Sequence, residues 1–314
     1  MNKSEQKNQI RNGLETYMKL HGLSQNDVAK KAGVNAAYLI QIRKGIDVIK
    51  VKDKDVEIGF QHYVKIAEMM GMRLEGTKVT GTKKTEQLAF MMAHLQDAKD
   101  NSEAAWLVAE TGAGKTFSLD IFKRKYPQEV FSIKIGFNDS IKDILDKLAD
   151  EIKVQDTWKG SKTGRISIIC KHLKNLKRTG KNTMLVFDEC EYMRANTLCT
   201  TKEFYDQLNG WCSIVYVSTP ELSNKVDKLI EKKAPGIAQW FRRLKFKKKE
   251  APEIDRNFEV FLDGIEPELK MWLQDNCYNY GELTDVLNPA MREAERLKKP
   301  LNLDLVLTIL NRIY

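Results

Sequence analysis

The segment AETGAGKT, residues 109–116, is the feature that most restricts how this chain of 314 residues can fold. It follows the apolar run AAWLVA, residues 104–109, and it opens a segment expected to be helical. A glycine-rich turn between a strand and a helix is typical of a phosphate-binding loop, whose backbone N–H groups face phosphates at the helix N-terminus. Ala109 departs from the pattern, because a glycine is usual there. We call residues 109–116 the P-loop.

The P-loop predicts which residues contact ATP and Mg²⁺. Lys115 is expected to reach the β- and γ-phosphates, and Thr116 to hold Mg²⁺. The alternative is a chance glycine-rich turn, which the position between strand and helix argues against. The full set of residues expected to contact the nucleotide is Glu110, Thr111, Gly112, Ala113, Gly114, Lys115, Thr116 and Phe117.

Short apolar runs alternate with helical segments through the middle of the chain. The expected strands are AAWLVA (104–109), VFSIKI (130–135), TMLVFD (183–188) and CSIVYVS (212–218). This alternation predicts an α/β fold, in which a parallel sheet is covered by helices on both faces. The last strand signal is the strand-like LKF at 244–246. After Phe246 the strand signal ends, and the remainder predicts a helical C-terminal lid.

Two carboxylates end the expected strand MLVFD, as in the Walker B element of a P-loop ATPase. Asp188 is expected to bind Mg²⁺ through water, and Glu189 to orient and deprotonate the attacking water. An acidic pair at a strand end can also be an ordinary helix cap. That alternative loses weight downstream of a P-loop.

Two further segments carry candidate catalytic groups. Thr219 follows the strand CSIVYVS and is either a sensor of the γ-phosphate or the cap of a helix that begins at Pro220. In WFRRLKF, Arg242 or Arg243 could reach the γ-phosphate bound by a neighbouring subunit, as an arginine finger. The alternative is an ordinary basic surface, since six basic residues lie between Arg242 and Lys249.

The first 71 residues predict a small helix-turn-helix domain. A helix is expected over 8–20, two short helices around the turn at Gly33, and an amphipathic helix from Val56 to Met70. Ser24 and Asn35 stand where helix N-caps belong. A domain kept for protein docking is the alternative to one that reads DNA. The residues expected to face the major groove are Asn35, Ala36, Ala37, Tyr38, Gln41 and Lys44.

Basic residues are unevenly distributed and suggest double-stranded DNA as a partner. Residues 1–84 carry +7 of the net charge of +9. A second basic segment lies between Asp156 and Asp188, where eight cations occur without an acid. Its apolar residues predict a helix with the cations outside, although a charge run is often only a solvated face. The expected DNA contacts there are Lys159, Lys162 and Arg165.

These segments predict four parts: a helix-turn-helix domain (1–71), a linker (72–84), an ATPase core (85–250) and a lid (251–314). No apolar run reaches the roughly 20 residues of a membrane helix, and the N-terminus lacks the apolar core of a secretion signal. No membrane partner and a cytoplasmic location are therefore expected. The cysteines and histidines show no metal-ligand spacing.

The order of these motifs resembles the phage Mu B family of AAA+ ATPases. The likeness covers a helix-turn-helix, AETGAGKT, a basic loop, MLVFDE, STP, WFRRL and a helical C-terminus. It implies a protein that binds double-stranded DNA when loaded with ATP, assembles into homo-oligomeric filaments, selects target DNA and stimulates a transposase. It also favours Arg243 as the finger. Where many AAA+ lids carry a sensor arginine, this chain has Thr284, unless Arg292 takes that role.

Two other functions remain open from the sequence. A helicase loader would share the ATPase core but engage single strands. A transcription regulator would read an operator with its helix-turn-helix and use ATP only to control oligomerisation. A random-pool selection of bound DNA separates the last of these, because a regulator returns one palindromic motif.

Overall fold

The structure, a computed structural model, describes residues 3–51, 54–70, 83–154 and 160–313. The chain forms two compact units. The first comprises residues 1–81 with 288–300, and the second comprises residues 82–287 with 301–314. The expected linker, 72–84, lies outside the described residues except for Lys83 and Lys84. The boundaries at residues 71, 84 and 250 remain predictions.

The N-terminal helices form the expected helix-turn-helix. Their bounds are α1 (Lys3–His21), α2 (Gln25–Ala32), α3 (Ala36–Arg43) and α4 (Phe60–Met69). Ser24 caps α2 and forms a capping box with Asp27, and Asn35 caps α3. Gly33 ends α2 at φ 61°, a left-handed conformation that favours glycine. Buried Val28, Leu39 and Ile42 belong to the core of this unit.

An antiparallel hairpin in the same unit was not expected, and it contains Val56, where the sequence predicted the start of a helix. Strand β1 (Val48–Val51) pairs with β2 (Lys54–Glu57), with Val48 opposite Glu57. The two strands mix apolar with charged side chains without strict alternation, and Val48 and Val56 are exposed. This pattern carries little burial signal, which is why the sequence did not single it out.

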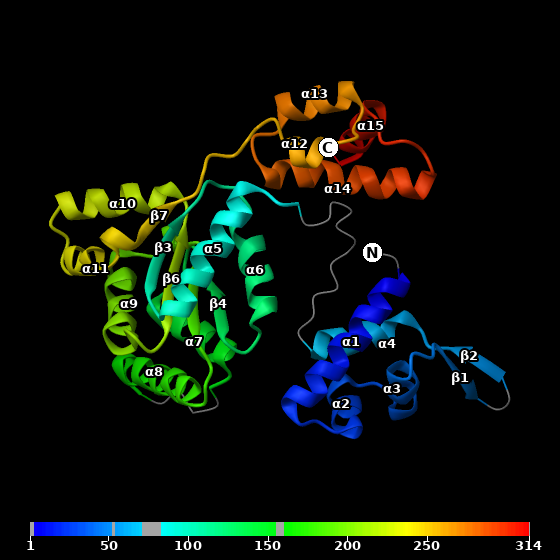
Figure 1. Ribbon diagram of the computed structural model, residues 1–314, viewed down its shortest axis with the longest axis horizontal. Coiled ribbons are helices and arrows are strands. Elements are labelled where there is room, and N and C mark those ends of the chain that lie inside the picture. Colours follow the sequence, from blue (N-terminus) through cyan, green and yellow to red (C-terminus); the bar gives the residue numbers. More distant parts are fainter. Residues whose placement is uncertain (1–2, 52–53, 71–82, 155–159, 314) are drawn as a thin grey trace. The chain divides into compact units, whose positions relative to one another are not determined.

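A parallel sheet of five strands forms the centre of the second unit, in the order β4-β5-β6-β3-β7 (Figure 1). The four expected strands are present, each a residue or so shorter than the apolar run. Their bounds are β3 (Ala104–Val108), β4 (Val130–Lys134), β5 (Met184–Asp188) and β6 (Ser213–Ser218). β3 and β6 are fully buried, as expected of strands covered on both faces.

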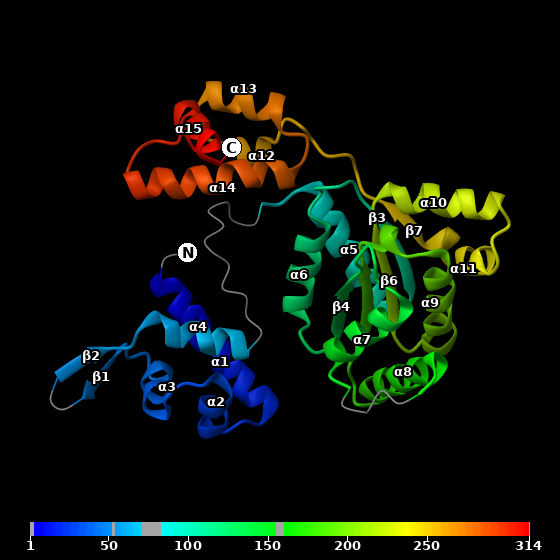
Figure 2. The same ribbon diagram turned by 180° about the vertical axis from the view of Figure 1, so that it is seen from behind.

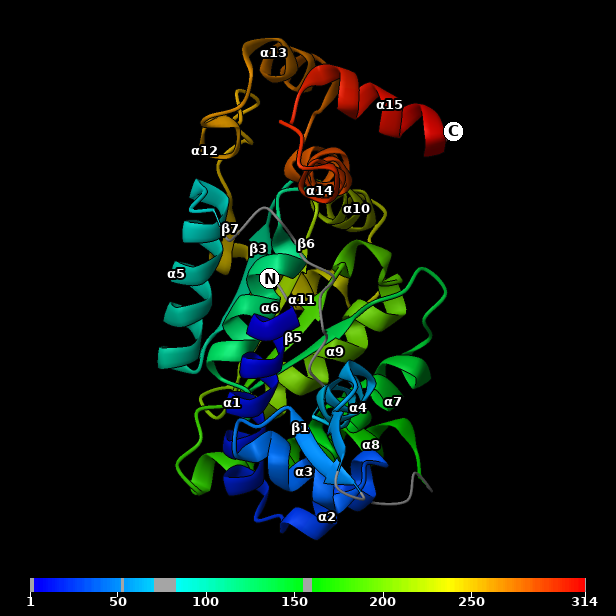
Figure 3. The same ribbon diagram turned by 90° about the vertical axis from the view of Figure 1, so that its right-hand side faces the viewer.

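Helices cover both faces of the sheet. On one face, α5 (Glu86–Asn101) and α6 (Lys115–Lys125) pack on Leu107 and Val217. On the other, Trp106 and Tyr216 meet the second set, so α5 and α7 lie on opposite sides in the edge-on view (Figure 3). The second set is α7 (Ile141–Ile152), α8 (Lys162–Arg178), α9 (Ala195–Leu208), α10 (Pro220–Glu231) and α11 (Ile237–Leu244). The fold class expected from the sequence is therefore confirmed.

The expectation that no strand follows Phe246 was wrong. The segment LKF is not a strand, because Leu244 ends α11 and the next residues form a 3-10 turn, η2 (Lys245–Lys247). The last strand is β7 (Lys248–Glu250), which pairs with β3 at the edge of the sheet (Figures 1 and 2). Three charged residues carry no apolar pattern, so only pairing with β3 defines this strand.

The C-terminal region is helical, as expected. It contains α12 (Glu259–Leu262), α13 (Pro267–Asn276), α14 (Tyr280–Leu297) and α15 (Leu303–Ile313). Leu269, Leu273, Leu283 and Leu287 are buried. Among the described residues, none of the helices has the length and apolar character needed to cross a membrane.

Candidate nucleotide site and nucleic-acid surfaces

The P-loop joins the carboxyl end of β3 to the N-terminus of α6, and β3 lies between β6 and β7. Gly112 and Gly114 adopt φ values of 73° and 82°, which L side chains rarely adopt. The first N–H groups of a helix lack the usual carbonyl partner four residues back, so a helix N-terminus can present them to an anion. The loop therefore has the backbone form that phosphate binding requires.

Lys115 turns inward at the start of α6. Its side chain is buried, and Nζ donates to the carbonyl oxygens of Ala109 (3.0 Å) and Glu110 (2.8 Å). Burial lowers the pKa of Lys115, while the nearby carboxylates, Glu191 first among them, act to raise it. A buried ammonium held only by carbonyl dipoles gains most from an anion placed beside it.

Thr116 and Asp188 come together although they lie 72 residues apart in the chain. The Thr116 hydroxyl donates to Asp188 Oδ2 at 2.7 Å. Asp188 ends β5 and is 2% exposed, and this burial raises the pKa of its carboxyl. A hydroxyl and a buried carboxylate are oxygen ligands of the kind Mg²⁺ takes directly or through water. The residues present therefore fit the magnesium ion expected here.

Glu189 follows Asp188 in a left-handed conformation, at φ 57°. Its Oε1 is 2.8 Å from Nζ of Lys134, and this contact raises the pKa of Lys134. Lys134 ends β4, the neighbour of β5, and no sequence pattern marked it as a site residue. The rule that side chains at the carboxyl ends of adjacent parallel strands meet could have found it, once the strand order was known.

Thr219 directly follows β6, which lies beside β5 as the sensor hypothesis required. The residue occupies the N-cap position of α10, but its side chain makes no cap hydrogen bond. Its N–H donates to Glu191 Oε2 at 3.2 Å, whereas Oγ1 is buried without a hydrogen-bond partner among the described residues. A buried hydroxyl that lacks a partner at the carboxyl end of the sheet favours the sensor role over the cap.

The lid contacts the P-loop through a residue the sequence did not indicate. A Cβ added to Gly112 would lie 2.1 Å from Oδ1 of Asn279, so the side chain of Asn279 rests against this glycine. The next residue, Tyr280, donates its hydroxyl to Gln87 at 2.9 Å, and Gln87 donates to the carbonyls of Pro252 and Glu253. By contrast, the Thr284 hydroxyl is used inside α14, where it donates to Tyr280 and Gly281.

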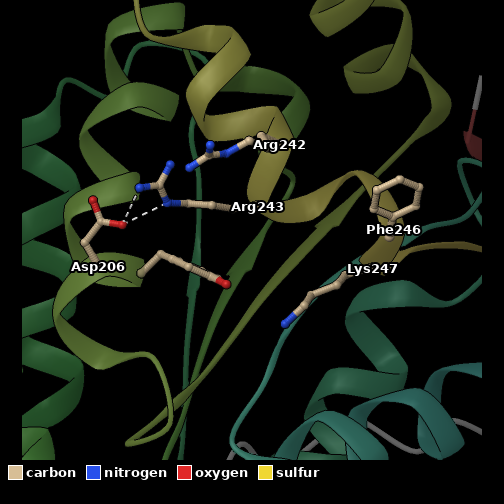
Figure 4. Close-up of a pocket in the computed structure, with 6 residues that line it drawn as sticks. Asp206, Arg242, Arg243, Phe246 and Lys247 are labelled. Atoms are coloured by element: carbon tan, nitrogen blue, oxygen red, sulfur yellow. Dashed lines mark hydrogen bonds and ion pairs between the residues drawn. The ribbon is translucent and has the colours of Figure 1, made fainter.

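Arg242 and Arg243 lie at the end of α11 beside an open pocket of about 390 Å³ (Figure 4). Arg243 is held within the chain, because its guanidinium contacts Asp206 at 2.6–2.8 Å and the Gln239 carbonyl at 2.7 Å. Arg242 is exposed and forms no ion pair with the described residues. Of the two finger candidates, Arg242 is therefore the one whose guanidinium is not held by an ion pair with the described residues.

The three residues near α8 that were expected to contact DNA do not share one environment in the structure. Lys162 is exposed at the start of that helix, and Lys159 lies outside the described residues. Arg165 does not belong to the exposed basic surface, because it is 6% exposed and pairs with Asp146 of α7. That part of the expectation was wrong. An acid 19 residues earlier in the chain draws the guanidinium inward, and only the packing of α7 on α8 shows this.

The recognition helix α3 presents few cations. Asn35 is committed as the cap of α3, since its Oδ1 accepts the Ala37 N–H at 2.8 Å, and the ring of Tyr38 packs on His62. Gln41 is half-buried, whereas Ala37 and Lys44 are exposed. Arg43 is paired with Glu15 of α1. The surface of α3 thus offers small and neutral groups more than charge.

Comparison with known proteins agrees with both units. A family model described as an AAA domain matches residues 98–226, which include the P-loop, Asp188 and Thr219. The chain is also 36% identical over 66 residues to an uncharacterized HTH-type transcriptional regulator of Methanocaldococcus jannaschii, a match that covers 21% of this chain and 86% of that protein. The chain therefore carries an AAA domain, and through its helix-turn-helix segment it belongs to the HTH-type family.

Two solved structures share the AAA+ fold of this chain. The Aeropyrum pernix ORC1 protein in complex with DNA gives a TM-score of 0.53 at 16% identity, covering 76% of this chain and 68% of that one. The Aeropyrum pernix ORC2 protein, in ADPNP–ADP complexes, gives 0.50 at 16% identity, covering 70% and 65%. This chain thus spans about two thirds of each, and the likeness is one of fold.

Proposed function

We propose that this chain is a DNA-binding AAA+ ATPase that hydrolyses ATP with Mg²⁺ and whose assembly on DNA depends on the nucleotide. The proposal rests on one observation: Lys115, the Thr116–Asp188 pair and the Thr219 hydroxyl, which lacks a partner in the described chain, all lie at the carboxyl end of the sheet. The ADPNP–ADP complexes of the structurally similar ORC2 protein support nucleotide binding at this fold.

Each residue has a distinct role in this proposal. Lys115 leaves the carbonyls of Ala109 and Glu110 to bind phosphate oxygens, and Thr116 with Asp188 holds the metal. Mg²⁺ neutralises charge on the phosphates when it is bound. Glu189 holds the attacking water and takes its proton, which requires its carboxylate to leave Lys134.

Two donors complete the site by contacting the γ-phosphate. Thr219 donates its hydroxyl from within the same subunit, since Oγ1 has no other partner in the described chain. Arg242 donates from a neighbouring subunit, as an arginine finger. Assembly and hydrolysis are coupled in this way, because one active site needs residues from two copies of the chain.

The DNA partner is proposed to be double-stranded and bound with little sequence preference. The small side chains on α3 argue for weak base readout, and the cations of α8, including Lys162, suit phosphate contacts. The structurally similar ORC1 protein was solved with DNA. The resemblance of motif order to the Mu B family extends the proposal to a filament that selects target DNA and activates a transposase.

A transcription regulator is the second candidate, because the relative from Methanocaldococcus jannaschii bears that name. In that function the helix-turn-helix reads an operator, and ATP controls oligomerisation. A helicase loader would instead prefer single strands and bind a replicative helicase.

The deciding experiment measures DNA binding with a slowly hydrolysed ATP analogue, with ADP and without nucleotide. The proposal expects binding to random-sequence duplex only with the analogue, and a random-pool selection that returns no palindrome. Equal binding in all three states would defeat it. Calorimetry of the purified chain with ATP and Mg²⁺ tests nucleotide uptake separately.

A further inference from the structure

Helix α8 presents one face of positive charge at the amino end of the sheet, far along the strands from the P-loop (Figure 1). It joins α7 to β5, so its C-terminal end lies close to where β5 begins. Its 17 residues include six Lys and Arg and no Asp or Glu. Lys171, Lys174 and Arg178 follow one another at helical spacing on one side, and we call these three the basic stripe.

The basic stripe is not neutralised by the rest of the described chain. None of its three cations forms an ion pair there, and Arg178 donates only to the neutral Asn175. Like charges three and four residues apart on a helix oppose its stability. The helix is therefore not stabilised by this arrangement, which points to an anionic partner outside the chain.

An aromatic ring lies directly against the stripe. Trp211 follows Gly210 in the turn between α9 and β6, and its side chain is 37% exposed. Lys174 Nζ is 5.7 Å from the centre of its ring, and Arg178 Cζ is 5.4 Å from it. Trp106 and Trp240, by contrast, are 1% exposed in the core of the same unit.

Cations beside an accessible indole suit one class of ligand in particular. Single-stranded nucleic acid offers phosphates to the cations and an unpaired base to the ring, whereas the bases of a duplex are already stacked. From Lys171 to Arg178 the helix rises about 10 Å, which spans about three nucleotides at the 3.4 Å rise of a stacked strand. Stacking on a ring requires no particular base, so little sequence preference is expected.

We propose that the basic stripe and Trp211 form a binding site for single-stranded nucleic acid, with one base stacked on Trp211 and the phosphates on Lys171, Lys174 and Arg178. This site is separate from the nucleotide site and goes beyond the duplex binding proposed above. Its test needs no ATP, so it can fail while nucleotide-dependent duplex binding holds, and the reverse.

The test measures affinity of the full chain for a labelled oligothymidylate of about 20 nucleotides by fluorescence anisotropy. Trp211→Ala should weaken binding about tenfold, and Trp211→Phe should restore most of it, because phenylalanine keeps a ring for stacking. The double variant Lys174→Gln, Arg178→Gln should reduce the slope of log affinity against log salt by about 1.4, since each phosphate contact contributes about 0.7.

Arg124→Gln is the matched control. Arg124 is an exposed cation in the last turn of α6, on the other face of the sheet, and its loss should leave single-strand affinity within about twofold. Melting curves establish that each variant is folded, and a duplex of the same length is measured alongside. The site is refuted if Trp211→Ala binds the oligonucleotide as the wild type does, or if Trp211→Phe loses as much as Trp211→Ala. If Trp211→Ala weakens duplex and single-strand binding equally, the site is also refuted.

Discussion

The functional groups at the two ends of the parallel sheet differ in how deeply they are buried and in how many chain segments supply them. At the carboxyl end, Lys115, Asp188 and Thr219 come from three different segments, and each is less than a tenth exposed. At the amino end, the basic stripe comes from one helix, with Lys171 and Arg178 exposed and Lys174 half-buried. Buried groups interact strongly and only in one geometry, whereas exposed charges act weakly and almost independently. Single substitutions should therefore be severe at the first end and graded at the second.

The largest effects are expected at the carboxyl end, where one substitution should abolish ATP binding and another should slow only hydrolysis. Lys115→Ala should abolish ATP binding and assembly on DNA. Glu189→Gln should keep ATP binding within about twofold but slow hydrolysis about 10³-fold, because the water loses its base, and should hold assemblies on DNA. Calorimetry and phosphate release measure the two effects. Normal hydrolysis by Glu189→Gln would show that another group is the base.

The next largest effect distinguishes the two arginines beside Asp206. Arg242→Ala should lower hydrolysis by the assembled protein about 100-fold, with ATP affinity of the unassembled chain unchanged. Arg243→Ala should cost much less, because Arg243 is held by Asp206. The measurement is hydrolysis by wild type mixed with each variant on DNA. A larger effect for Arg243 reverses the assignment.

A smaller effect is expected at Thr219. Thr219→Ala should reduce hydrolysis about tenfold, because a hydrogen bond to the charged γ-phosphate is lost. Thr219→Ser keeps the hydroxyl and should restore most of the rate. If the two variants are equally active, the hydroxyl has no role in sensing.

Because Asp188 is buried, removal of its charge is expected to raise the stability of the folded protein. Because burial raises the pKa of Asp188 in the folded state, ionisation of this group opposes folding. The cost is present wherever the pH lies above the unfolded pKa, and therefore at pH 7, and it disappears as the pH falls and the group is protonated in both states. Asp188→Asn should therefore raise the melting temperature of the nucleotide-free protein at pH 7 by about 2–4 °C. Calorimetric scans check this, and a lower melting temperature would mean that the Thr116–Asp188 contact outweighs the burial of charge.

The smallest effect belongs to the amino end. Lys171→Gln alone should weaken single-strand binding about twofold at moderate salt, and the effect should vanish at high salt because exposed charges are screened. Anisotropy titrations at several salt concentrations measure this. A tenfold loss that persists at high salt would mean that this end, too, depends on a specific geometry.

Much of the fold could be predicted because its signals are local. The strands β3, β5 and β6 are short apolar runs, and the P-loop is contiguous with one of them. Ser24 and Asn35 cap α2 and α3 as their positions in the sequence suggest. The hairpin β1–β2 and the strand β7 were missed, because their residues are charged or exposed and their definition rests on pairing with another strand.

The residues of the candidate site divide in the same way, into those with a local sequence pattern and those without one. Lys115, Thr116, Asp188 and Glu189 carry recognisable local patterns, and the structure brings them together. Lys134 and Asn279 have no such pattern, since each matters only through a partner distant in the sequence. Arg165 shows the converse error, because a cation in a basic segment is buried against Asp146.

The sequence by itself determined that a phosphate-binding turn follows a buried strand, that an acidic pair ends another, and that a helix-turn-helix precedes them. Those features depend on neighbours within a few residues, where backbone conformation and hydrophobic periodicity act directly. Only the tertiary structure decided that Asp206 holds Arg243 while Arg242 stays exposed, that the Thr219 hydroxyl lacks a partner, and that Trp211 lies against the cations of α8. Burial and charge pairing are set by the packing of segments far apart in the chain, and no local pattern encodes that packing.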